Sequence, residues 1–287
     1  MRHAVFFIAF LWCSAQAAAQ SRPAPDKETD KPFVLGRTLT FYSAQLAENR
    51  TVNIYLPDDY NPADTTRYPV IYLLDGSADE DFIHIVGLVQ YNTFPWINRI
   101  PKSIVVGIAN VDRKRDFTFP SAQPGDKKLI PTSGHSDKFI AFIEKDLLPF
   151  IQSKYKTTPA TTIIGQSLGG LVATEILFKK PELFTQYIII SPSLWWDDGS
   201  LLTYKAPVLQ ANFNRPIQVY IGVGKEGLAP VEKPHVMEVE ANVLADLLKN
   251  TPAKNITTYF DYLPAENHAT VTHQAVFNAF RLLYPAK

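Results

Sequence analysis

Cysteine is almost absent from this 287-residue chain, which has one residue of this type, Cys13. Cys13 lies inside an amino-terminal segment that we expect to be removed, so the remaining chain would carry no thiol. Without thiols it can form neither a disulfide nor a thiolate metal site, and it has no cysteine nucleophile. The histidines are scattered and lack the spacing of a ligand cluster, so we expect no metal site and no cofactor.

An excess of charge of either sign is also missing, because 28 lysine and arginine residues balance 28 aspartate and glutamate residues. Proteins that bind nucleic acid usually have a basic face, so we expect no nucleic-acid partner. After the amino-terminal segment no apolar run reaches the roughly 20 residues that cross a bilayer. Hydrophobic residues nevertheless make up 46% of the chain, which is enough for the core of a globular domain.

The amino-terminal segment has the three parts of a signal peptide. A positive start at Arg2 is followed by an apolar run to Trp12 and then by small residues that satisfy the A-x-A cleavage pattern. The alternatives are a membrane anchor, for which the run is too short, and a lipoprotein anchored at Cys13, for which the preceding Trp12 is too bulky. We therefore predict a periplasmic or secreted protein without stable membrane insertion after cleavage, divided into a signal peptide (1–19), a flexible leader (20–34) and a single domain (35–287).

Strand-like and helix-like segments alternate after the leader, as in an α/β sheet with helices on both faces. An antiparallel start is followed by continuous apolar runs, which are typical of parallel strands buried on both faces. The pattern predicts a mostly parallel sheet of eight strands. We expect strands at 38–44, 51–56, 69–74, 103–108, 161–164, 187–190, 217–221 and 257–262, and helices at 137–155, 168–179, 237–248 and 271–283.

A G-x-S-x-G motif, from Gly165 to Gly169, lies between a predicted buried strand and a predicted helix. This is the context of the nucleophile elbow in the α/β-hydrolase fold, where the serine stands on a sharp turn. The flanking glycines let the strand and helix approach closely, and the helix N-terminus favours developing negative charge. The alternative is a glycine-rich turn that only packs tightly. We predict an α/β-hydrolase fold with Ser167 as the nucleophile.

A serine hydroxyl needs a neighbouring base, and in this fold the acid and then the histidine follow the serine along the chain. Three histidines follow Ser167. His235 precedes a helix in a proline-rich loop, and His273 lies within the final helix. His268 follows the last strand, at the carboxyl edge of the sheet where ligands bind in such folds. We favour His268 as the base.

The acid should lie in the loop after the strand at 217–221. Glu226 is the only carboxylate of that loop and is flanked by glycines in Gly224–Gly227. The alternatives are Glu232, Glu238 and Glu240 farther along the chain, or a serine–histidine pair without an acid. We predict Glu226.

An acyl-transfer intermediate also needs two N–H donors for its oxyanion. We predict the N–H groups of Leu168, directly after the nucleophile, and of Ser77, in the loop after the strand at 69–74. The alternative for Asp75-Gly76-Ser77 is a turn without a catalytic part.

Four segments of the chain match a known family: Tyr72–Gly76, Asp112–Thr118, Gly165–Gly170 and Ser191–Trp196. On these segments the chain resembles the bacterial esterase family that includes S-formylglutathione hydrolase and the trilactone siderophore esterases, and it looks most like the siderophore-esterase branch. The resemblance implies catalysis by Ser167, His268 and an acid at Glu226. One position departs from the family, since Phe119 stands between Thr118 and Pro120 where the family usually has proline directly after the threonine.

Arg113 and Trp195 are the candidate substrate-binding residues. Arg113 offers a fork of donors to an anionic group, and Trp195 offers a flat face to an aromatic acyl group. A surface salt bridge for Arg113 and core packing for the tryptophan are the alternative roles.

We therefore expect a serine carboxylic-ester hydrolase for a small-molecule ester, with a ferric or iron-free catecholate siderophore such as enterobactin as the first candidate. The alternative enzyme is an esterase that removes acetyl or feruloyl groups from polysaccharide side chains. The non-enzymatic alternative is a binding protein on a hydrolase scaffold.

Overall fold

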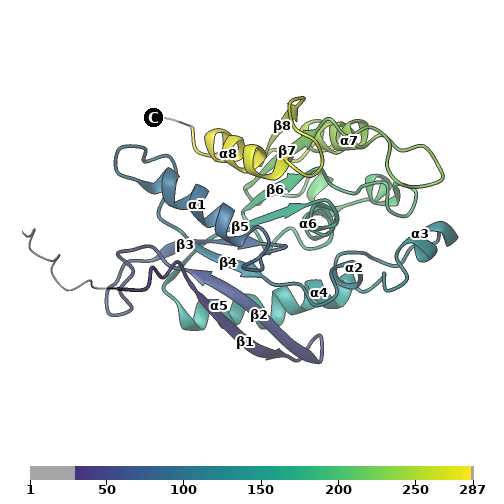
Figure 1. Cartoon of the computed structure of the whole chain (residues 1–287). Coiled ribbons are helices and arrows are strands. Elements are labelled where there is room, and N and C mark those ends of the chain that lie inside the picture. The colour runs from purple at the N-terminus through teal and green to yellow at the C-terminus, as the bar shows by residue number, and fades with distance from the viewer. Residues whose placement is uncertain (1–29, 286–287) are drawn as a thin grey trace, which may run out of the picture. The chain divides into compact units, whose positions relative to one another are not determined.

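Eight strands form one sheet in residues 30–285, the part of the chain that the computed structural model describes (Figure 1). The predicted signal peptide (1–19) and most of the predicted leader (20–34) lie outside these residues. Residues 30–34 are exposed and have no regular secondary structure, and the unit that carries the sheet begins at Leu35. None of the helices in the described range is both long and apolar enough to cross a membrane.

The sheet is mostly parallel, as predicted. Its strand order is β1-β2-β4-β3-β5-β6-β7-β8, and only the pairs β1–β2 and β2–β4 are antiparallel. Strands β3 to β8 therefore end at one carboxyl edge. The strand bounds are β1 Arg37–Ser43, β2 Glu48–Tyr55, β3 Tyr68–Leu73, β4 Ile104–Ile108, β5 Thr157–Gln166, β6 Gln186–Ile190, β7 Ile217–Gly224 and β8 Ile256–Leu263.

Helices cover both faces of this sheet and make two separate cores. Successive side chains of a strand point to opposite faces, so in β3 Val70 and Tyr72 join one core while Ile71 and Leu73 join the other. The first core is completed by α4 (Ser136–Phe142), α5 (Leu148–Lys154), α6 (Leu168–Lys179) and α7 (Met237–Lys249), and the second by α1 (Phe82–Thr93) and α8 (Val271–Leu283).

The helix predicted at 137–155 is interrupted. Between α4 and α5 the chain forms a π-helical turn, Ile143–Leu147, and Pro149 stands near the start of α5. Proline lacks an N–H and its ring clashes with the carbonyl of the preceding turn, so the regular hydrogen-bond ladder cannot continue through it. One predicted helix is therefore three helical segments.

Three helices were not predicted: α1, α2 (Arg113–Asp116) and α3 (Pro124–Leu129). α1 follows Asp81 at its N-cap, but the Asp81 side chain makes no cap hydrogen bond and the first turn holds no acidic residue, so its start is only weakly marked. α2 and α3 have only four and six residues. Both short helices follow β4 and lie beside the carboxyl edge.

Candidate active site

Ser167 stands on the sharp turn between β5 and α6. Its φ and ψ are 60° and −121°, a positive-φ conformation that costs a non-glycine residue conformational energy and recurs at functional sites. A Cβ at Gly165 would lie 2.3 Å from the backbone oxygen of Gly169, so only glycine allows the strand and helix to meet this closely. The turn leaves the Ser167 side chain partly exposed at the carboxyl edge.

His268 and Glu226 meet beside this turn, because the parallel neighbours β7 and β8 end together, with Gly224 opposite Leu263. The Nδ1 atom of His268 lies 2.7 Å from Oε2 of Glu226. The Glu226 side chain is 2% exposed, whereas that of His268 is 44% exposed. A buried carboxylate at Nδ1 leaves Nε2 as the nitrogen that can take a proton from a serine.

The loop of His268 is tied to the residue before the candidate nucleophile. The side-chain Nε2 of Gln166 donates a 2.9 Å hydrogen bond to the backbone oxygen of His268. Within the described part of the chain, Ser167 Oγ makes no hydrogen bond to His268; its neighbour is Ser193 Oγ at 3.4 Å. Catalytic hydrogen bonds are often long without substrate and tighten when it binds.

The alternative histidines and acids have other partners. His235 pairs with Glu240 and with Asp198, and His273 lies on α8 with its ring centre 4.7 Å from that of His84. Glu238 does not reach His268 but accepts backbone N–H groups from the loop of Glu226. His268 and Glu226 are the pair tied to the turn of Ser167, through the hydrogen bond from Gln166 to the His268 carbonyl.

In residues 30–285 the backbone N–H groups of Leu168 and Ser77, the predicted oxyanion donors, have no hydrogen-bond partner. Leu168 is the first residue of α6, and the first N–H groups of a helix have no acceptor within it. The N–H of Ser77 donates to no protein atom in residues 30–285, although its carbonyl accepts from Glu80 and Phe82. Because β3 and β5 are parallel neighbours, the loop of Ser77 and the turn of Ser167 leave the sheet at adjacent positions.

Arg113 uses two of its three guanidinium nitrogens within the protein, and its role in substrate binding stays a prediction. Its Nε and Nη2 bind the carboxylate of Asp75 at 2.6 and 3.0 Å, and Nη2 also donates to the carbonyl of Gln166 at 3.1 Å. Arg113 thereby joins α2 to the Asp75–Ser77 loop and to the residue before Ser167. The physical reason is that Asp75, at the start of that loop, presents a carboxylate that matches the guanidinium geometry.

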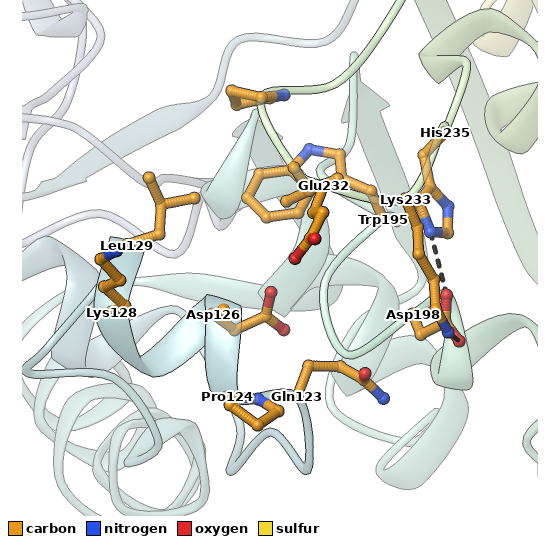
Figure 2. Close-up of a pocket in the computed structure, with 13 residues that line it drawn as sticks. Gln123, Pro124, Asp126, Lys128, Leu129, Trp195, Asp198, Glu232, Lys233 and His235 are labelled. Carbon is orange, nitrogen blue, oxygen red and sulfur yellow. Dashed lines mark hydrogen bonds and ion pairs between the residues drawn. The ribbon is translucent and has the colours of Figure 1, made fainter.

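Trp195 and Trp196 are both buried in the same core, with Trp195 6% exposed, but only Trp195 lines a pocket. Trp196 is fully buried, and its Nε1 donates to the carbonyl of Phe119, so it packs in the core. Trp195 lines a pocket of about 530 Å³ between α3 and the loop that precedes α7. In Figure 2 the side chains of α3 lie on one side of this pocket, and Asp198, Lys233 and His235 lie on the other.

Ser193, two residues before Trp195, contacts the candidate nucleophile but does not line this pocket. The Ser193 N–H donates to the Ser167 carbonyl at 3.1 Å, in addition to the contact between the two hydroxyls. Ser193 was not singled out from the sequence, because a serine beside a Ser-Pro turn has no signal that distinguishes it. In the described range no group of three or more histidine, aspartate or glutamate side chains is placed to hold a metal ion.

Comparison with known proteins gives matches over most of the chain. The model of the family described as "Putative esterase" matches residues 43–277. The chain is 30% identical over 275 residues to the ferri-bacillibactin esterase BesA of Bacillus subtilis, covering 90% of this chain and 93% of that protein.

Two solved structures are similar in fold and in sequence. An IroE-like serine hydrolase from Shewanella oneidensis has a TM-score of 0.76 at 31% identity, covering 87% of this chain and 80% of that one. The BES protein from Bacillus cereus also has a TM-score of 0.76, at 26% identity, covering 91% of this chain and all of that one.

Proposed function

The chain belongs to this esterase family and is an esterase, and we propose that it is a serine hydrolase acting on an ester of an aromatic, anionic small molecule, with a catecholate siderophore lactone as the first candidate. The observation that carries the proposal is the meeting of Ser167, His268 and the buried Glu226 at one edge of the sheet. We further propose that it works in the periplasm or outside the cell, for which the predicted signal peptide is the support.

The proposed reaction runs through an acyl-enzyme. His268 takes the proton of Ser167 Oγ as that oxygen attacks the ester carbonyl, and Glu226 holds the imidazole by Nδ1 and stabilises its positive charge. The N–H groups of Leu168 and Ser77 receive the oxyanion. His268 then gives its proton to the leaving alkoxide. In the second half, water activated by His268 releases the acid and restores Ser167.

The pocket lined by Trp195 combines an aromatic side chain with charged groups of both signs. Its lining includes the indole of Trp195 and two lysines, Lys128 and Lys233. The carboxylate of Asp126 is already satisfied by the Ser121 hydroxyl and a backbone N–H, and Asp198 pairs with Lys233. Glu232 also lines the pocket, so the indole of Trp195, and not an excess of positive charge, is the feature that favours an aromatic over an aliphatic acyl group.

The Bacillus subtilis relative BesA is a ferri-bacillibactin esterase, which supports the same substrate class. The test compares purified wild-type protein with the Ser167→Ala variant on four substrates: a neutral aryl ester, a ferric trilactone siderophore, acetylated xylan and a feruloyl ester. We expect the siderophore to have the highest kcat/KM and the variant to lose all four activities. A preference for xylan or feruloyl esters would overturn the siderophore assignment and favour a polysaccharide-side-chain esterase.

The location is tested separately. In cells that express the full chain, the mature protein should appear in the periplasmic or extracellular fraction, and its amino terminus should lie close to residue 20. Full-length protein in the cytoplasm would contradict the predicted signal peptide without affecting the reaction.

A further inference from the structure

The carboxylate of Glu226 is held by few contacts of its own. One oxygen, Oε2, meets His268, whereas the other, Oε1, is buried and has no hydrogen-bond partner in the described part of the chain. A side chain held at one oxygen only depends on its backbone for its position. The geometry between acid and base therefore depends on what fixes the turn at Glu226.

Several contacts fix that turn, including a 3.0 Å hydrogen bond from the Met237 N–H to the Gly227 carbonyl; two others flank or reach Glu226 itself. On the side of the base, the Lys225 N–H donates to the Glu266 carbonyl at 2.7 Å, which joins the turn to the loop of His268. A Cβ at Gly224 would lie 2.9 Å from the same carbonyl, so glycine is needed for the two loops to approach. This contact sets the distance between the loops but not the direction of the Glu226 side chain.

The second contact comes from Glu238, twelve residues along the chain. Its Oε1 accepts the Glu226 N–H at 2.7 Å and the Gly227 N–H at 3.0 Å, and its Oε2 accepts the Gly227 N–H at 2.9 Å. Gly227 has a φ of +76°, so the turn brings two successive N–H groups toward one carboxylate. Burial raises the pKa of Glu238, but the hydrogen bonds from Glu226 and Gly227 outweigh it and hold this pKa below its ordinary value.

We propose that Glu238 is a positioning residue of the active site: its carboxylate fixes the backbone of Glu226 so that the Glu226 side chain meets His268. This inference rests on the proposed roles of Glu226 and His268. Glu238 touches neither the substrate nor the reacting atoms, and its effect on catalysis passes entirely through Glu226.

The prediction is a loss in kcat with little change in KM. A small displacement of a catalytic group can lower the rate up to about 100-fold. We expect Glu238→Ala to lower kcat on p-nitrophenyl acetate about tenfold. The loss should not exceed that of Glu226→Gln. Glu238→Gln keeps one acceptor oxygen and should lose less. Asp246→Ala is the matched control, because it removes an exposed carboxylate from the same helix, α7, far along from the turn, and it should leave kcat unchanged.

A double-mutant comparison separates positioning from a general effect on folding. If Glu238 acts through Glu226, the variant Glu226→Gln/Glu238→Ala should be no slower than Glu226→Gln alone, within about twofold, because residues that act as one unit are not additive. Thermal unfolding of each variant shows whether it is folded, and if Glu238→Ala is not, the same comparison is made with Glu238→Gln.

Two results would overturn the inference: wild-type kcat in a folded Glu238→Ala protein, or losses that multiply in the double variant. Wild-type activity of Glu226→Gln would instead refute the proposed acid itself, and with it any need to position it.

Discussion

Replacing Arg113 by alanine tests whether this residue binds substrate or supports the site. In the structure its guanidinium bridges Asp75 and the carbonyl of Gln166, the two points that lead into the Ser77 loop and the Ser167 turn. Removing it leaves the Asp75 carboxylate, which is 13% exposed, without its cation. We expect the Ser77 loop to shift relative to the Ser167 turn. The N–H groups of Ser77 and Leu168, the proposed oxyanion donors, would then no longer be aligned.

The magnitude follows from the contacts. A hydrogen bond to a charged group contributes about 1.5–3 kcal/mol. Because the Arg113 side chain is 29% exposed, solvent screens the pair and the lower end applies. About 1.5 kcal/mol in the transition state corresponds to roughly a tenfold loss of kcat/KM. Arg113→Lys should retain only part of the activity lost in Arg113→Ala, since an ammonium group cannot bind Asp75 and Gln166 with the fork geometry of a guanidinium.

The assay measures kcat/KM of wild type and Arg113→Ala on a neutral aryl ester and on an anionic siderophore ester. Equal losses on the two are expected from a supporting role. The exposed neighbour Lys114 supplies the control, because Lys114→Ala removes a cation from the same helix without touching Asp75. A loss at least tenfold greater on the anionic ester than on the neutral one would refute the supporting role and favour Arg113 as a substrate ligand.

Local spacing was enough to predict the main elements and the nucleophile turn. Helices α6 and α8 begin and end at the predicted residues, because apolar periodicity and flanking turns mark both ends. Strand β5 is longer than predicted, Thr157–Gln166 instead of 161–164. Its first four residues, 157–160, are partly or fully exposed and include no large apolar side chain, so the apolar pattern starts later than the backbone pairing does.

The residues that support the site could not be read from the sequence, because their partners are set by the fold. Arg113 and Asp75 are 38 positions apart, and nothing in either segment indicates whether the guanidinium faces a substrate or a carboxylate. Glu238 was considered only as an alternative acid. Its actual contact is with backbone N–H groups, which every residue except proline has and which leave no trace in the amino-acid pattern.

Three further variants test the proposed catalytic residues and the rim of the pocket. Ser167→Ala should remove hydrolysis of p-nitrophenyl acetate, by up to about 10⁶-fold in kcat, while circular dichroism stays unchanged; a folded variant with more than about a tenth of the wild-type rate would exclude Ser167 as nucleophile. Glu226→Gln should cost orders of magnitude less than that, since the orienting group is partly replaceable, and an unchanged kcat/KM would show that no acid at this position is needed. His235→Gln should change the stability in a pH-dependent way. Burial lowers the pKa of His235, but hydrogen bonds and charge from Glu240 and Asp198 outweigh it and raise this pKa above its ordinary value of 6.5. A pKa raised by folding means that the protonated form stabilises the folded state, fully below about pH 6.5 and progressively less as the pH rises through the folded-state pKa. The difference in free energy of unfolding between wild type and His235→Gln, measured with urea, should therefore be larger at about pH 6 than at about pH 9. A difference that is constant, or that grows toward the higher pH, would mean that His235 is held as a neutral imidazole and that its two carboxylate contacts do not stabilise its charge.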